Sequence, residues 1–121
     1  MIKGTLLTES LRIGASLAVA GLLVTRLERR HVSGTASQPD VWTFLEFEAH
    51  DDVAGPLAAA LEVSLQVEDG WYADFASDAE HVVVFANHTF RYRRDDPAGR
   101  RAAEAYGRSV GVPDDQLDWP D

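Results

Sequence analysis

The segment Val41–Ala49 is the clearest strand of the chain, because its side chains alternate between two faces. One face holds Val41, Thr43, Leu45 and Phe47, and the other holds Trp42, Phe44, Glu46 and Glu48. The first face is predicted to join a core. The second is apolar at its start and acidic at its end.

Five further segments have β-type patterns and are predicted to be strands. They are Ile2–Leu11, Leu22–Val32, Trp71–Ala76, His81–Ala86 and Thr89–Arg94. The sequence leaves a choice at 81–94, which forms either two strands or one long bent strand. It also leaves Arg12–Gly21 open, as a loop with a short strand or as a buried helical turn. Gly34, Ser37 and Pro39 predict a turn or loop at 33–40.

Two helices are predicted from apolar spacing and capping residues. The first covers Asp52–Gln66, with Asp51 and Asp52 placed where an N-terminal cap belongs. The second has Asp96 as its cap, Pro97 in its first turn and Gly111 at its end. The tail that follows contains Leu117 and Trp119, and we expect Trp119 to dock on the body of the protein.

The predicted order of elements is β, β, β, α, β, β, β, α, which indicates a single α+β domain over residues 1–121. We expect a mostly antiparallel sheet of five to six strands with both helices packed on one face. A ferredoxin-like topology with an N-terminal strand extension is the first expectation, and a strongly bent, barrel-like sheet is the alternative.

Charge is segregated along the chain, whose net charge is −9. Between His31 and Phe90 there are eleven acidic residues and no Lys or Arg, so every basic residue lies in 3–30 or 91–108. If the two basic segments met in space, they would form one cationic face. The net charge opposes binding of nucleic acid, so that partner is not expected. Pairing of the arginines with the many acids, within the chain or across a dimer, is the first expectation.

Composition excludes several classes of protein. The chain has no cysteine, which excludes disulfides and thiolate chemistry and fits a cytoplasmic location. The apolar stretch Ile13–Val24 is too short to span a membrane as a helix, which needs about 20 residues. It also lacks the flanks of a signal peptide, so no membrane association is expected.

Tyr72 and Asp74 share a strand face opposite Trp71, Ala73 and Phe75, and could orient a ligand or act as an acid and a base. Arg91 and Arg93 share a face of a later strand and have the geometry for anionic groups. These four are the candidate ligand-binding residues. The alternative is that Tyr72 and Asp74 take part in cross-strand hydrogen bonding on a solvated face and have no ligand.

His50, Asp51 and Asp52 are adjacent and cannot all face one metal ion without an irregular loop. No motif of a nucleophilic enzyme or a phosphate loop is present either. No catalytic residue, metal or cofactor is therefore predicted.

Trp42 and Phe44 point away from the core face of their strand, so they are candidate interface residues. If two helices cover one side of the sheet, large apolar side chains on the other side remain exposed and favour association. A symmetric homodimer is therefore expected. The alternative is that the first strand or Ile13–Val24 folds over this face within one molecule.

Several segments together resemble a family of small bacterial and archaeal proteins with no assigned activity. They are Gly70–Phe75, Val82–Phe85, Phe90–Tyr92, Tyr106–Ser109, Gly111–Pro113 and Gln116–Trp119. The resemblance covers roughly the C-terminal two-thirds of the chain, from Trp42 onward. It implies a free-standing domain and assigns no role to any residue.

The sequence thus favours a non-catalytic binding or protein-interaction domain that self-associates. The alternative is a small enzyme, or a protein that binds a small anionic ligand, with a pocket formed by Tyr72, Asp74 and Arg91.

Overall fold

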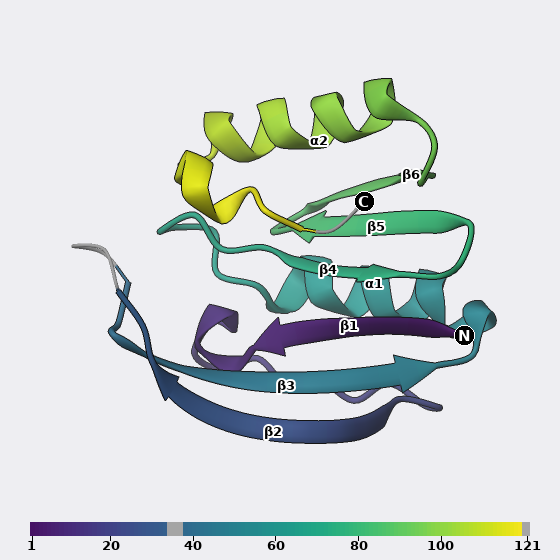
Figure 1. The fold of residues 1–121 in the computed structure, drawn as a ribbon. Coiled ribbons are helices and arrows are strands. Elements are labelled where there is room, and N and C mark those ends of the chain that lie inside the picture. Colours follow the sequence, from purple (N-terminus) through teal and green to yellow (C-terminus); the bar gives the residue numbers. More distant parts are fainter. Residues whose placement is uncertain (34–37, 120–121) are drawn as a thin grey trace.

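A computed structural model describes residues 1–33 and 38–119 of the chain. The described residues form one antiparallel sheet of six strands in the order β2-β3-β1-β4-β5-β6, together with two α-helices (Figure 1). The strands are β1 (Ile2–Leu7), β2 (Leu23–His31), β3 (Val41–Ala49), β4 (Ala73–Ala76), β5 (Glu80–Phe85) and β6 (His88–Arg93). The helices are α1 (Ala54–Ser64) and α2 (Pro97–Ser109), with 3-10 turns at Thr8–Ser10, Asp51–Val53 and Asp114–Gln116.

The strand β1 lies in the middle of the sheet, between β3 and β4. The register pairs Thr5 with Glu46 of β3 on one side and with Asp74 of β4 on the other. Gly4 permits this close approach, because a Cβ there would meet the Asp74 carbonyl oxygen at 2.6 Å. The absence of a side chain at Gly4 thus allows β4, with Asp74, to lie close to β1 in the middle of the sheet.

The two faces of the sheet have separate hydrophobic cores. On one face, α1 packs through Leu57 and Leu61 on a cluster that includes Val82 and Val84 of β5. On the other face, α2 and the segment after it pack on Val83 and Phe85. Neighbouring side chains of a strand point to opposite faces, so β5 is buried from both sides.

The helices therefore lie on opposite faces of the sheet, and the prediction that both pack on one face is wrong. In Figure 1, α1 lies behind the sheet, whereas α2 lies beside β6, at the far end from β2. The strand order is also not that of a ferredoxin-like sheet, so that predicted topology is not supported. The central β1 separates β3 from β4, although no other strand lies between these two strands in the sequence.

The C-terminal part of the fold follows its predicted capping. The Asp96 carboxylate accepts hydrogen bonds from the backbone N–H groups of Ala98 and Gly99, and Pro97 begins α2. Gly111 has the positive φ of a helix terminus, at 96°. Trp119 is only 3% exposed, so the predicted docking of this side chain is confirmed.

Two local predictions need correction, and the choice left open at 81–94 is decided in favour of two strands. Asp51 and Asp52 belong to a 3-10 turn and make no side-chain cap, because α1 begins later, at Ala54. The first strand ends at Leu7 rather than Leu11, where another 3-10 turn replaces it. A turn at Asn87, with φ of 63°, separates β5 from β6, so one long bent strand does not form. The loop predicted at 33–40 lies partly outside the described residues.

The segment Arg12–Gly21 has no regular strand or α-helix. Leu17 and Val19 pack against the cluster on the α1 face. It therefore does not cover the Trp42 side of the sheet. No helix of the described residues lies over that side of β2, β3 and β1, and this side forms the surface described next.

Candidate functional site

A cavity of about 350 Å³ opens on the face of the sheet that bears α2, beyond the edge of the covered part. Its floor comes from β1, β3 and the start of β4, and one wall comes from Gln116 and Asp118 of the C-terminal segment. Arg30 of the edge strand β2 lines the opposite side. The cavity thus lies at the boundary between the part of this sheet face that α2 and the C-terminal segment cover and the part that they leave uncovered.

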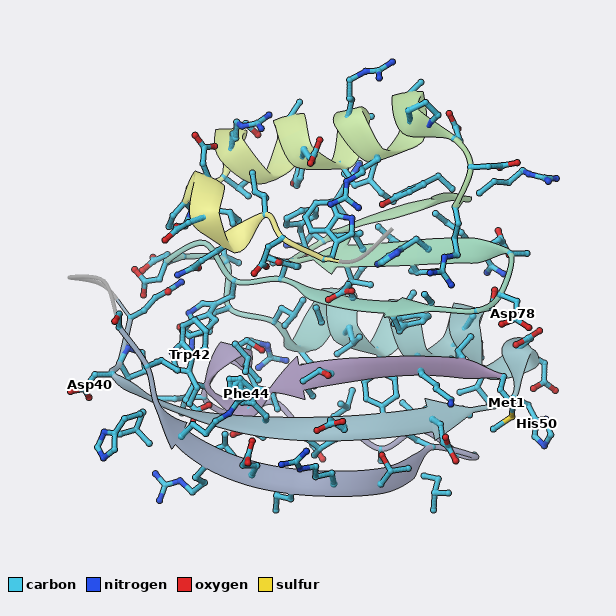
Figure 2. The ribbon with its side chains drawn as sticks, in the orientation of Figure 1. Met1, Asp40, Trp42, Phe44, His50 and Asp78 are labelled. Atoms are coloured by element: carbon cyan, nitrogen blue, oxygen red, sulfur yellow. The ribbon has the colours of Figure 1, made fainter. Side chains whose placement is uncertain are left out.

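Aromatic rings form a corner of this cavity. The Trp42 ring lies 5.8 Å from Trp71 and 6.2 Å from Phe44, measured between centroids, at interplanar angles of 58° and 52°. Trp42 and Phe44 belong to the non-core face of β3, and Figure 2 shows them close together near the start of that strand. The buried Nε1 of Trp42 has no hydrogen-bond partner within the described residues. Such a donor is costly to leave unpaired.

Asp74 supplies a carboxylate to the cavity and is held from behind by His81. The Nε2 of His81 lies 3.0 Å from Oδ2 of Asp74, and the two side chains are 2% and 24% exposed. The histidine ring also stacks on Tyr92, with centroids 5.8 Å apart. If Nε2 carries the proton, Nδ1 remains a buried acceptor without a partner in the described part of the chain. The histidine thus fixes the orientation of Asp74, while the carboxylate faces the cavity.

Tyr72 connects the cavity to the C-terminal segment. Its hydroxyl donates a hydrogen bond to the backbone carbonyl of Gln116 and lies 3.5 Å from Oδ1 of Asp118. Burial raises the pKa of Tyr72 far above its usual range, and the negative charges of Asp74 and Asp118 add to this effect. Tyr72 therefore stays protonated at neutral pH and serves as a hydrogen-bond donor rather than a base.

Arg30 places a cation on the aromatic wall. Its guanidinium carbon lies 3.8 Å from the centroid of the Phe44 ring, a cation–π contact. Its Nε also lies 2.9 Å from Oε1 of Glu28, so the charge is partly offset. A positive group is therefore already accommodated against one ring of this corner.

The cavity brings together four of the six residues singled out from the sequence. Tyr72 and Asp74, predicted as ligand residues, lie beside Trp42 and Phe44, predicted as interface residues. Arg91 and Arg93 do not join them. Arg91 pairs with Val82 in register and therefore lies on the α1 face, because Val82 belongs to the α1 cluster.

The arginines of β6 are engaged locally. Arg91 makes a bidentate contact with Glu80, at 2.9 and 3.1 Å, and Arg93 contacts Asp95 at 3.2 Å. The expected pairing of arginines with acids occurs here within the chain, with Glu80 of the middle segment at Arg91 and with the nearby Asp95 at Arg93. The two basic segments do not merge into one cationic face, because β2 and β6 lie at opposite edges of the sheet.

The aromatic residues of β6 do not form an open platform for nucleic-acid bases. Phe90 and Tyr92 pack in the core under α2, and the Tyr92 hydroxyl accepts a hydrogen bond from Trp119. Base stacking requires exposed ring faces. The interleaved arginines and aromatic residues of this strand therefore occupy two different faces, one solvated and one buried.

The role of His81 beside Asp74 was not predicted from the sequence. Its spacing held a usable signal. In the hairpin of β4 and β5, Asp74 pairs with Val83, so His81 is its diagonal neighbour on the same face. Arg30 and Asp118 have no comparable signal, because β2 and the C-terminal segment approach the cavity only through tertiary packing.

Within residues 1–33 and 38–119, no cluster of three or more His, Asp or Glu side chains could hold a metal ion. In the same part of the chain, no helix has both the length and the apolar character needed to cross a bilayer. No family model, no curated protein and no solved structure matches this chain.

Proposed function

We propose that the protein is a non-catalytic binding domain, and that the aromatic cavity beside Asp74 is its binding site. The single observation that supports this most is the composition of the cavity. It combines a concave apolar corner with a few oriented polar groups, which is the usual make-up of a small-molecule site. Its volume of about 350 Å³ lies within the range of such sites.

The rival proposal of a small enzyme loses part of its basis. That proposal placed Arg91 next to Tyr72 and Asp74, but Arg91 lies on the other face of the sheet and pairs with Glu80. Tyr72 is also bonded to the Gln116 carbonyl, which leaves its hydroxyl proton engaged. A binding role requires no proton transfer from these groups.

The proposal is tested by nuclear magnetic resonance with a fragment library that spans neutral, cationic and anionic molecules. Binding fragments are expected to shift the indole N–H signals of Trp42 and Trp71 and the backbone amide of Asp74. Trp42→Leu should abolish the shifts at Trp71 and Asp74 while the remaining spectrum shows a folded protein. If no fragment of any charge class moves these signals, the cavity is not a binding site.

A second candidate function is self-association through the same surface. Trp42 and Phe44 are only partly buried within the monomer, although Trp71 and Arg30 pack against them. Closed two-fold pairing is the common way to bury such residues. Sedimentation equilibrium decides this proposal: a mass near 13.3 kDa at every loading would exclude the dimer. A dimer that dissociates on Trp42→Glu would place the interface here.

A further inference from the structure

We infer that the ligand of the cavity is a small organic cation, a methylated or alkylated ammonium group held between the aromatic corner and Asp74. This inference rests on the proposed binding function and adds the chemical class of the ligand. It depends on three features of the cavity: the faces of its aromatic rings, its two carboxylates, and the partial offset of the Arg30 charge by Glu28.

The first feature is the aromatic corner. Trp42, Trp71 and Phe44 all line the cavity, and the rings of Trp71 and Phe44 are tilted against Trp42 by 58° and 52° rather than stacked on it. The negative face of an aromatic ring attracts cations, and tryptophan does so best. Arg30 already uses the Phe44 face in this way, with its guanidinium carbon 3.8 Å from the ring centroid. The chain itself thus shows that this wall accepts an organic cation.

The second feature is the pair of carboxylates on the opposite wall. Asp74 and Asp118 both line the cavity together with Tyr72. Burial is the main cause that raises the pKa of Tyr72, and the negative charges of Asp74 and Asp118 raise it further. Because His81 fixes one oxygen of Asp74 from the buried side, this carboxylate is oriented before a ligand arrives.

The third feature is that Arg30 does not reverse this charge. Glu28 contacts Arg30 at 2.9 Å, so the charge of Arg30 is partly offset. Arg26 shares this carboxylate at 2.8 Å and also lies 3.7 Å from Glu46. Arg30 is the one cationic side chain among the described residues that line the cavity. An anionic ligand would share Arg30 with Glu28 and would have to approach Asp74 and Asp118, both of which would repel it.

The test uses three probes of nearly the same shape and different charge. They are choline, its uncharged carbon isostere 3,3-dimethylbutan-1-ol, and the anion 3,3-dimethylbutanoate. Each is titrated into the full-length protein at low ionic strength, and the indole signals of Trp42 and Trp71 are followed. We expect choline to bind and the isostere to bind roughly tenfold more weakly, since only the cation gains from ring faces and carboxylates.

Variants then assign the effect to residues. Asp74→Asn should weaken choline binding about five- to tenfold without changing the affinity for the isostere. Asp78→Asn is the matched control, because it makes the same change at the tip of the same hairpin, at the opposite end of the molecule from Trp42 (Figure 2). Trp42→Phe should retain part of the choline affinity and Trp42→Leu should lose it.

Arg30→Met gives the strongest discrimination, because it removes a competing cation and leaves a side chain of similar length. Choline should bind more tightly to this variant, by roughly two- to fivefold. If the isostere binds as well as choline, or if the anion binds best and Arg30→Met abolishes its binding, the cavity binds small molecules but the cationic class is wrong. If none of the three probes binds, the cationic class is likewise overturned, whereas the fragment screen decides the proposed function separately.

Discussion

The hydrogen bond between Trp119 and Tyr92 is expected to anchor the C-terminal segment, and with it one wall of the cavity. The indole Nε1 donates to Tyr92 Oη at 2.7 Å, and both groups are buried. Tyr92→Phe leaves the indole N–H without an acceptor, which costs about 1–3 kcal/mol of unfolding free energy. Trp119→Phe leaves the Tyr92 hydroxyl unpaired and also creates a cavity, so its cost should be larger.

A double-mutant cycle separates the hydrogen bond from the packing. The double variant buries no unpaired polar group, so its cost should fall below the sum of the single costs by roughly 1 kcal/mol or more. In a domain of this size, 1 kcal/mol corresponds to about 3–6 °C in melting temperature. Urea unfolding followed by circular dichroism supplies the four free energies.

Tyr106→Phe is the control for this cycle. Tyr106 packs on Phe85 with centroids 5.0 Å apart, and its hydroxyl makes no hydrogen bond within the described residues. Removing that hydroxyl should change the unfolding free energy by less than about 0.5 kcal/mol. If the costs of Tyr92→Phe and Trp119→Phe add within about 0.3 kcal/mol, the buried hydrogen bond does not anchor the segment.

Three further predictions concern the rest of the fold. Partial burial acts to raise the pKa of Glu9, but two hydrogen bonds from Thr43 outweigh it and lower the pKa below its ordinary value near 4.5. A carboxylate whose pKa is lower in the folded state stabilises the fold at pH values above its unfolded-state pKa. The stability advantage of the wild type over Glu9→Gln should therefore shrink as pH falls below about 4.5. A difference in urea unfolding that does not depend on pH would contradict this. Arg91→Glu should cost about 0.5–1 kcal/mol, because the Glu80 pair is half exposed, and a difference that does not shrink in molar salt would refute the electrostatic origin. Gly70→Ala should lower the melting temperature by several degrees, since φ is 70° and a Cβ would lie 2.5 Å from a backbone carbonyl at the end of α2; an unchanged midpoint would argue against this close approach.

The positions of the strands followed from the sequence because alternation is a local property. Val41–Ala49 has the predicted bounds, and the remaining strands differ mainly at their ends. Helix capping was equally local at Asp96, where the side chain meets two backbone N–H groups. Asp51 makes no such cap, because the chain first forms a 3-10 turn at Asp51–Val53 and α1 begins only at Ala54.

The placement of the helices did not follow, although the sequence contained a signal for it. Val82–Phe85 is a continuous apolar run, which is typical of a strand buried on both faces. Two helices on one face would have left half of these side chains in water. The alternation of side chains between the two faces also explains the composition of the site. Tyr72 and Asp74 were correctly placed on one face. Arg91 pairs in register with Val82 and therefore points to the α1 face instead.

The cavity exists because the sheet is wider than the elements that cover its second face. α2 and the C-terminal segment bury β5 and β6, and they end over Tyr72, where the Gln116 carbonyl accepts its hydrogen bond. β1 and β3 continue beyond this edge and expose Trp42 and Phe44. The floor of the site is therefore rigid sheet, but one wall belongs to a segment that only tertiary contacts hold. Docking of the C-terminal segment and binding of a ligand that touches Asp118 are therefore coupled. The free energy by which the ligand stabilises the docked segment equals the free energy by which docking strengthens ligand binding. Loss of the Trp119 hydrogen bond should thus weaken binding at the cavity, although Trp119 lies outside its lining.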